Sequence, residues 1–305
     1  MYWSYRHKDD LTEVPMYAIM GVTGHVGGAA ARELLRRGEP VRAVVRDQAK
    51  GADWAAAGAR VAVADFAHRE TLAESLRGCA GAFVLLPTDT AAADPDAAHR
   101  TMADTIAGAV RESQVPHVVM LSSVGADLAD GTGPIRWLHH LENGLRASGA
   151  QITAVRSGHF QEKVELLLGA VLHAGLYPVF ADSADVPTPM IATRDIGGVV
   201  ADLLLTPARA SEVVDLDGPS YTERQVAEEL SAILGRPLQV VTIPRPGWAA
   251  ALVDGGLPPR LAEELAGLYD AERRGILQLR GDRRLTGRTE LPETLRHLAK
   301  SIGTI

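Results

Sequence analysis

The sequence predicts an α/β protein with a doubly wound parallel sheet and a smaller, mostly helical C-terminal subdomain. Three observations lead to this fold class. Short apolar runs alternate with amphipathic stretches through the first half of the 305-residue chain, a glycine-rich turn joins the first run to the first amphipathic stretch, and the alternation weakens after residue 157. Apolar strands that alternate with helices are typical of βαβ units, whose parallel sheet carries helices on both faces.

The first half of the chain supplies most of the predicted sheet. Apolar runs bounded by turn residues are typical of buried strands, and we expect them at residues 18–20, 41–45, 60–64, 82–86, 117–121 and 152–155. The amphipathic stretches between them predict helices at residues 26–37, 69–77, 96–113 and 134–147. Gly38 stands where a C-terminal capping glycine belongs, so the first helix is expected to end there.

The second half predicts more helix than strand. Helices are expected at residues 160–172, 194–205, 222–234 and from 258, with strands at 212–216 and 238–243. Thr222 and Gln225 have the spacing of a capping box at the start of the third of these helices. We therefore assign residues 14–157, with about 190–217, to a dinucleotide-binding domain. Residues 158–189 and 218–305 are assigned to a substrate-binding subdomain over the ligand-binding edge of the sheet.

Composition and charge argue against several other classes of protein. The net charge of −7 argues against a general nucleic-acid binder or a protein of anionic membrane surfaces. Cys79 is the only cysteine, so no intrachain disulfide can form, and a cytoplasmic location fits. No apolar run approaches the ~20 residues of a transmembrane helix, and the polar first thirteen residues lack the apolar segment of a signal peptide. We expect a cytoplasmic protein whose partner is a small molecule, without nucleic-acid or membrane partners.

The glycine-rich turn at residues 21–27 is the most informative motif. Its three glycines lie between the first strand and a stretch whose apolar residues share one helical face. The first backbone N–H groups of a helix have no intrahelical partner, and the helix dipole is positive there, so a pyrophosphate binds well. Glycine lets the backbone turn sharply and approach the phosphates. The turn predicts that a dinucleotide is bound by Gly21, Thr23, Gly24, His25, Val26 and Gly27.

The end of the second strand indicates which dinucleotide is bound. NAD sites usually have an acidic residue here for the ribose hydroxyls, whereas this chain has Arg46 followed by Asp47. Arg46 can place a planar cation on a 2′-phosphate, and Lys50 is near enough in the chain to assist. We therefore favour NADP over NAD. In the alternative, Arg46 is a solvated cation and Asp47 binds the ribose of NAD.

The ends of the next two strands supply the remaining expected cofactor contacts. Asp65 and Phe66 follow the third strand and are expected to line the adenine pocket, with an ordinary turn as the alternative. Leu86 and Pro87 end the fourth strand, where the backbone would flank the ribose and nicotinamide, with an ordinary strand end as the alternative. Both expectations follow from the rule that ligands of such sheets bind outside the carboxyl ends of the strands.

Several motifs, taken in order, resemble the atypical short-chain dehydrogenase/reductases, and the NmrA-like branch in particular. The resemblance covers about residues 16–275, and the order of its motifs is more specific than any single one. The matching segments are residues 21–27, 41–46, 121–125, 141–149, 153–160, 195–197, 217–219 and 234–237. The resemblance implies a Rossmann domain, an NAD(P) site and a small C-terminal substrate domain.

The residues that catalysis would require are only partly present. Reduction by NADPH needs a positioned hydride donor and an acid that supplies a proton. In the classical members of the superfamily that the chain resembles, a Tyr-x-x-x-Lys pair and a serine do this work. Here no tyrosine lies between Tyr17 and Tyr177, and no lysine lies between Lys50 and Lys163. The isoflavone-reductase-like relatives have a lysine where this chain has Leu138, so neither branch's usual proton relay is present.

Three residues remain as catalytic candidates. Ser123 ends the fifth strand at the superfamily's serine position and could bind a substrate oxygen, or it could satisfy backbone. His139 lies beside the vacant lysine position, as does His140, but neighbouring helical residues point ~100° apart, so at most one can face a pocket. His159 follows the sixth strand near the expected nicotinamide end and is the preferred proton donor, with a packing role as the alternative.

Three functions fit these observations. We expect an NADPH-dependent reductase of a small, apolar or aromatic ketone, quinone or enone. The first alternative is an NmrA-type protein that senses NAD(P) and regulates a protein partner without turnover. The second is an isomerase or cyclase that reuses the fold without net redox chemistry. The sequence contains no nucleophile elbow, P-loop or zinc-binding pattern, so no metal is expected.

Overall fold

A computed structural model describes residues 15–301 of the chain. Its centre is an eight-stranded sheet in which every neighbouring pair of strands is parallel. The strand order is β3-β2-β1-β4-β5-β6-β10-β13. These strands span Arg60–Val63, Val41–Val45, Tyr17–Ile19, Gly81–Val84, His117–Ser123, Gln151–Ser157, Glu212–Asp217 and Arg283–Thr286. The order reverses between β1 and β4, so the doubly wound parallel sheet expected from the sequence is confirmed.

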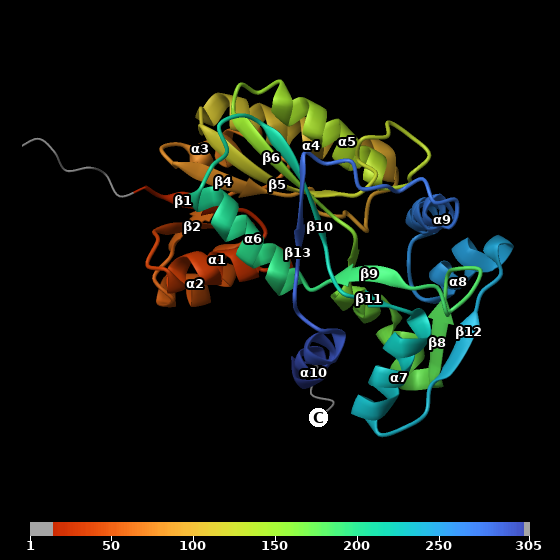
Figure 1. Cartoon of the computed structure of the whole chain (residues 1–305). Coiled ribbons are helices and arrows are strands. Elements are labelled where there is room, and N and C mark those ends of the chain that lie inside the picture. Colours follow the sequence, from red (N-terminus) through yellow and green to blue (C-terminus); the bar gives the residue numbers. More distant parts are fainter. Residues whose placement is uncertain (1–14, 302–305) are drawn as a thin grey trace, which may run out of the picture.

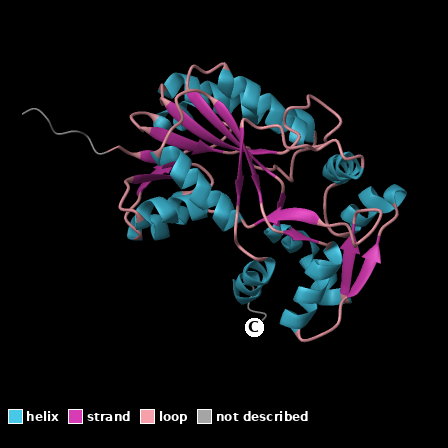
Figure 2. Cartoon of the chain, in the orientation of Figure 1, coloured by secondary structure: helices cyan, strands magenta, loops and turns pink. Residues whose placement is uncertain are grey.

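Helices cover both faces of this sheet, as Figure 1 and Figure 2 show. One face carries α1 (His25–Arg36), α2 (Ala52–Ala56) and α6 (Thr193–Leu205), with the short 3-10 helix η1 (Gln48–Gly51) before α2. The other face carries α3 (Arg69–Leu76), α4 (Pro95–Ser113) and α5 (Ile135–Arg146). The first-half strands and helices agree with the sequence-based ranges to within one or two residues at most ends. No helix among residues 15–301 is both long and apolar enough to cross a bilayer.

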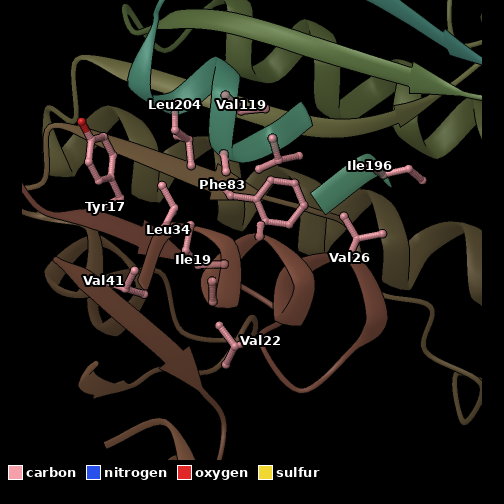
Figure 3. Close-up of a cluster of buried hydrophobic side chains, with 14 of the residues drawn as sticks. Tyr17, Ile19, Val22, Val26, Leu34, Val41, Phe83, Val119, Ile196 and Leu204 are labelled. Atoms are coloured by element: carbon pink, nitrogen blue, oxygen red, sulfur yellow. The ribbon is translucent and has the colours of Figure 1, made fainter. Parts of the chain in front are cut away.

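The core on the α1 side joins the sheet to α1 and α6 (Figure 3). Ile19 and Phe83 from the sheet and Leu34 from α1 are fully buried in it, as is Ile196 of α6. The two helices pack closely, because a Cβ on Gly197 would lie only 2.4 Å from the Cβ of Ala29. This contact fixes α6 against α1, although the two helices are more than 150 residues apart in the chain.

The second half contributes smaller elements beyond the carboxyl edge of the main sheet. β7 (His159–Phe160), β9 (Thr188–Ile191) and β11 (Ser220–Tyr221) form a three-stranded sheet, and β8 (Leu176–Val179) pairs with β12 (Gln239–Thr242). The helices here are α7 (Glu223–Leu234), α8 (Trp248–Asp254), α9 (Pro259–Arg273) and α10 (Leu291–Ser301), and the 3-10 helix η4 spans Arg245–Gly247. The predicted capping box of Thr222 and Gln225 is present at the start of α7.

The helix expected at residues 160–172 is irregular instead. It forms the 3-10 helix η2 (Gln161–Leu167) and the single π-helical turn η3 (Ala170–Ala174). Tertiary hydrogen bonds explain the irregularity: Gln161 donates to two backbone carbonyls outside the segment, and Glu162 accepts from the N–H and hydroxyl of Thr193 at the start of α6. Side chains that bind neighbouring elements in this way hold the backbone away from regular α-helical geometry.

A buried ion pair joins α5 to β6. Glu142 and Arg156 are 3% and 6% exposed, and Nε and Nη2 of Arg156 donate to the two carboxylate oxygens of Glu142 over 2.9 and 2.8 Å. Ser122 of β5 donates to the same carboxylate over 2.6 Å. Each charge is therefore compensated, which is what burial of an ion pair requires.

We expect Glu142→Gln to destabilise the protein by about 3–5 kcal/mol, because it removes the charge that Arg156 binds through two hydrogen bonds and leaves only Asp127, whose carboxylate lies 3.7 Å from Nη1 of Arg156. Asp185→Asn is the matched control, since its pair with Arg224 is exposed and contributes about 1 kcal/mol or less. Urea unfolding curves for both variants measure the difference. Equal effects of the two substitutions would contradict the structural role given to the buried pair.

Candidate active site

The glycine-rich turn lies at the carboxyl end of β1 and leads directly into α1. Gly21 has a φ of +65°, and a Cβ there would lie 2.6 Å from the side chain of Leu85. A Cβ on Gly27 would lie 2.4 Å from the carbonyl oxygen of Gly21. Both positions therefore require glycine for steric reasons, and the turn brings the start of α1 against the end of the strand.

The N-terminus of α1 is open to a ligand. Gly24 is its N-cap residue, no side chain caps the helix, and its first turn has no acidic residue. Thr23, Gly24 and His25 are exposed, whereas Val26 and Gly27 are buried. The first-turn amides can donate hydrogen bonds at the positive end of the helix dipole, so the turn fits the pyrophosphate of a dinucleotide.

The residues expected around the adenosine half of the cofactor follow β2 and β3. Arg46 and Lys50 are exposed, and neither has an ion-pair partner within the part of the chain that the structure describes. Asp47 accepts from a backbone N–H two residues on, over 2.9 Å, and caps η1. Asp65 makes the same kind of turn over 2.9 Å, and Phe66 packs against the core on the α3–α5 side. The two cations are thus available to a phosphate, while Asp47 has a local structural role.

The residues expected near the nicotinamide follow β4, which pairs with β1. Leu86 and Pro87 are both half-buried, and Leu86 lines the cavity described next. On the other side of the glycine-rich turn, Nε2 of His25 lies 2.9 Å from a carboxylate oxygen of Glu165 in η2. This contact ties the turn to the second half of the chain.

Three adjoining pockets share lining residues beyond the carboxyl ends of β4 and β5, and we call them the three lobes of one apolar cavity. The sheet lobe, about 430 Å³, is lined by Leu86 and Leu138. The central lobe, about 370 Å³, lies between Ser123 and α9. The subdomain lobe, about 220 Å³, reaches Phe180, and Leu166 lines all three lobes. Cavities of this size and character are typical of sites for small organic ligands.

Helix α9 forms one wall of the cavity. Leu261, Leu265, Leu268 and Glu272 recur at helical spacing, so they share one face of α9, and all four line the sheet or central lobe. The three leucines make the sheet lobe largely apolar. Glu272, one turn further on, brings a carboxylate to the central lobe. Along α9, the wall of the cavity therefore changes from apolar side chains to a charged one.

Polar side chains gather where the central and subdomain lobes meet. His159 stands between two partners: its Nε2 is hydrogen-bonded to Glu272, and its Nδ1 lies 3.2 Å from Nζ of Lys163. Lys163 also donates to Glu223, whose second carboxylate oxygen accepts from the Tyr177 hydroxyl over 2.6 Å. Five elements, β7, η2, β8, α7 and α9, thus contribute one side chain each to a connected network.

Charge compensation keeps both acids of this network ionised. Burial alone would raise the pKa of Glu272, but the hydrogen bond with His159 brings it below its ordinary value. Burial would likewise raise the pKa of Glu223, but the charge and hydrogen bond of Lys163 lower it. Burial raises the pKa of Tyr269, which lines both lobes here, to about 12. The phenol is therefore neutral in ordinary buffers, whereas the two carboxylates are anions.

The three catalytic candidates from the sequence lie in different surroundings. Ser123 lines the sheet and central lobes, and His159 lines the central and subdomain lobes. His139 does not line any of the three, because its ring nitrogens bind the Ala126 carbonyl at 2.8 Å and the Asn143 amide at 2.9 Å. Leu138, one residue earlier, faces the sheet lobe instead. The structure thus brings Ser123 and His159 to one cavity and leaves His139 outside it.

Sequence reasoning missed Lys163, Glu223 and Glu272. They lie 60 or more residues from at least one of their partners in the network, so no local spacing connects them. Two local signals were present: Lys163 lies four residues after His159, and the capping box fixes the start of α7 and therefore the position of Glu223. Tertiary packing of irregular segments brings these side chains together.

Comparison with known proteins identifies an NAD(P)H-binding family. A family described as NAD(P)H-binding matches residues 21–207. The chain is 28% identical over 255 residues to the NAD(P)H azoreductase of Xenophilus azovorans, covering 83% of this chain and 86% of the relative. It is also 28% identical over 258 residues to quinone oxidoreductase 2 of Escherichia coli, covering 82% and 86%.

Solved structures share the fold. Triphenylmethane reductase of Citrobacter sp. superposes with a TM-score of 0.75 at 20% identity, over 94% of this chain and 99% of that one. The Escherichia coli quinone oxidoreductase 2 in complex with NADPH superposes with a TM-score of 0.71 at 22% identity, over 93% and 99%. These neighbours confirm the expected fold. Since the family match spans more than half of the residues, the chain belongs to the NAD(P)H-binding family.

Proposed function

We propose that this protein is an NAD(P)H-dependent reductase of small, conjugated acceptors such as quinones, enones or aromatic ketones. The observation that carries the proposal is the three-lobed cavity, which begins beside the expected nicotinamide position at Leu86 and contains a compensated cluster of charged groups. A protein that only sensed the cofactor would have no need of a roomy apolar cavity with such a cluster at its centre.

The cofactor, when bound, would supply a hydride from its nicotinamide ring. The glycine-rich turn and the open N-terminus of α1 would hold its pyrophosphate. Arg46 and Lys50 would bind a 2′-phosphate, which favours NADP over NAD. Asp65 and Phe66 would line the adenine, while Leu86 and Pro87 would flank the nicotinamide end.

The cavity residues would bind and orient the acceptor. The leucines of α9 and Leu138 of α5 would exclude water and pack against an apolar or aromatic ring. Ser123 would donate a hydrogen bond to an acceptor oxygen from the end of β5. The cluster around His159 would supply the proton that the reduction of a neutral acceptor requires. The names of the two curated relatives, an azoreductase and a quinone oxidoreductase, support this class of acceptor.

We expect Arg46→Ala to weaken NADPH binding roughly 10- to 100-fold and to leave NADH binding almost unchanged, because one charge-assisted interaction with the 2′-phosphate is lost. Fluorescence titration with both cofactors measures the two affinities. Arg60→Ala is the matched control, since Arg60 is exposed at the opposite end of the sheet. If NADPH and NADH lose affinity equally, Arg46 does not select the 2′-phosphate.

We expect the protein to oxidise NADPH in the presence of at least one naphthoquinone, cyclic enone or aromatic azo compound. Leu268→Trp should fill the junction of the sheet and central lobes and abolish turnover while NADPH still binds. Val253→Trp, on the exposed surface of α8, is its control. Tight NADPH binding by the wild-type protein without turnover of any acceptor would favour the sensor alternative.

A further inference from the structure

We propose that Lys163 donates the proton in this cavity and that His159 is a positioning residue for it. The inference rests on the proposed reductase function and names the group that completes the reaction. It follows from the number of hydrogens that each member of the network can donate, compared with the number of acceptors that each member contacts.

Both ring nitrogens of His159 already have partners. A lysine ammonium can only donate, so Nδ1 of His159 must accept the hydrogen bond from Lys163, at 3.2 Å. The single ring hydrogen then resides on Nε2 and is donated to the Glu272 carboxylate. The imidazole therefore has no hydrogen left for a ligand in the cavity, unless it first gives up one of these two bonds.

The Lys163 ammonium has one more hydrogen than it has acceptors among the described residues. Its ammonium carries three hydrogens, of which one is donated to His159 and one to Glu223. Within the described part of the chain no further acceptor contacts Nζ. Lys163 lines both the central and the subdomain lobes and is 26% exposed, so the third hydrogen is available to a ligand there.

The two acceptors hold the ammonium in a fixed place. Glu223 is anchored at the start of α7, and its second oxygen accepts from the Tyr177 hydroxyl over 2.6 Å, with Tyr177 fully buried. His159 is anchored in turn by Glu272 of α9. A long, flexible lysine side chain that is fixed in this way loses little further freedom when it donates to a ligand.

The network also suits the charge changes of the reaction. The Lys163 ammonium is fixed by Glu223 and by His159, and it can stabilise negative charge that develops on an acceptor oxygen. Bound NAD(P)H would supply a hydride, which reduces the acceptor by two electrons and would leave that oxygen anionic. The Nζ–H bond of Lys163 then breaks, an O–H bond forms, and the neutral amine takes a proton from water through the subdomain lobe.

Two kinds of acceptor separate proton donation from hydride transfer. A neutral quinone or enone needs a hydride and a proton, whereas a cationic triarylmethane dye becomes a neutral product when it takes a hydride alone. Lys163→Met should lower kcat for the neutral acceptor by about 100-fold or more. The same variant should reduce the cationic dye within about threefold of the wild-type rate, because that reaction asks for no proton.

The pH dependence gives an independent readout. With the neutral acceptor, the pH profile of kcat should differ between the wild type and Lys163→Met, whereas with the cationic dye the two profiles should agree. Lys163→Arg keeps a cationic donor and should recover part of the activity. His159→Gln should lower kcat for the neutral acceptor less than Lys163→Met does. The substitution removes one contact that positions Lys163 but leaves the proton donor itself in place. Circular dichroism and NADPH titration establish that each variant is folded and binds cofactor.

Three other results would contradict the role proposed for Lys163. If Lys163→Met slows both acceptors equally while NADPH still binds, Lys163 is not the proton donor. If His159→Gln abolishes reduction of the neutral acceptor and Lys163→Met does not, His159 donates the proton directly. If the wild-type protein reduces neither acceptor, the proposed reductase function fails, and the role of Lys163 fails with it.

Discussion

The arrangement of the whole molecule depends on the close approach of Gly27 to the carbonyl of Gly21. Without a Cβ at Gly27, α1 begins directly against the end of β1, and its open amides face the place where a pyrophosphate fits. The same placement lets α1 pack on α6 through the contact of Ala29 with Gly197. The start of α6 is in turn held by Glu162 of η2, which accepts from Thr193. One steric constraint in the turn therefore determines where η2, and with it Lys163, lies over the cavity.

Two clusters of compensated charge lie in different parts of this protein. At the junction of α5 with the sheet, Glu142 and Arg156 neutralise each other, and the Ser122 hydroxyl also donates to Glu142. At the cavity, the ammonium of Lys163 lies among carboxylates that come from α7 and α9. The first arrangement stabilises the junction of α5 with the sheet, while the second leaves a donor unused. The structural pair joins two elements of the fold, whereas the cluster at the cavity lies where a ligand can reach one of its donors.

The sequence predicted the nucleotide-binding half well because that half is organised locally. Each βαβ unit carries its own apolar period, and the glycine spacing of residues 21–27 marks the turn. The edge strand β13 escaped prediction, because Arg283–Thr286 is polar and becomes a strand only by pairing with β10. Residues 160–172 had an apolar content that favoured a helix, but tertiary hydrogen bonds from Gln161 and Glu162 made the segment irregular. The charged cluster was not predicted for a related reason, since Glu223 and Glu272 come from segments 60 or more residues away from Lys163 and His159.

On α5, Leu138 stands where the isoflavone-reductase-like relatives have a lysine, and this difference affects the cavity. Leu138 faces the sheet lobe and adds to its apolar wall, so the end of the cavity nearest β4 has no ionisable group on α5 to offer. The charged groups enter from the opposite side, on elements of the second half of the chain. An acceptor ring can then lie against apolar residues near the nicotinamide position while its oxygen points toward Lys163. This division separates the surface that binds a ring from the group that protonates it. Substitutions in α7 or α9 can therefore change the acceptor without disturbing the glycine-rich turn that we propose holds the cofactor.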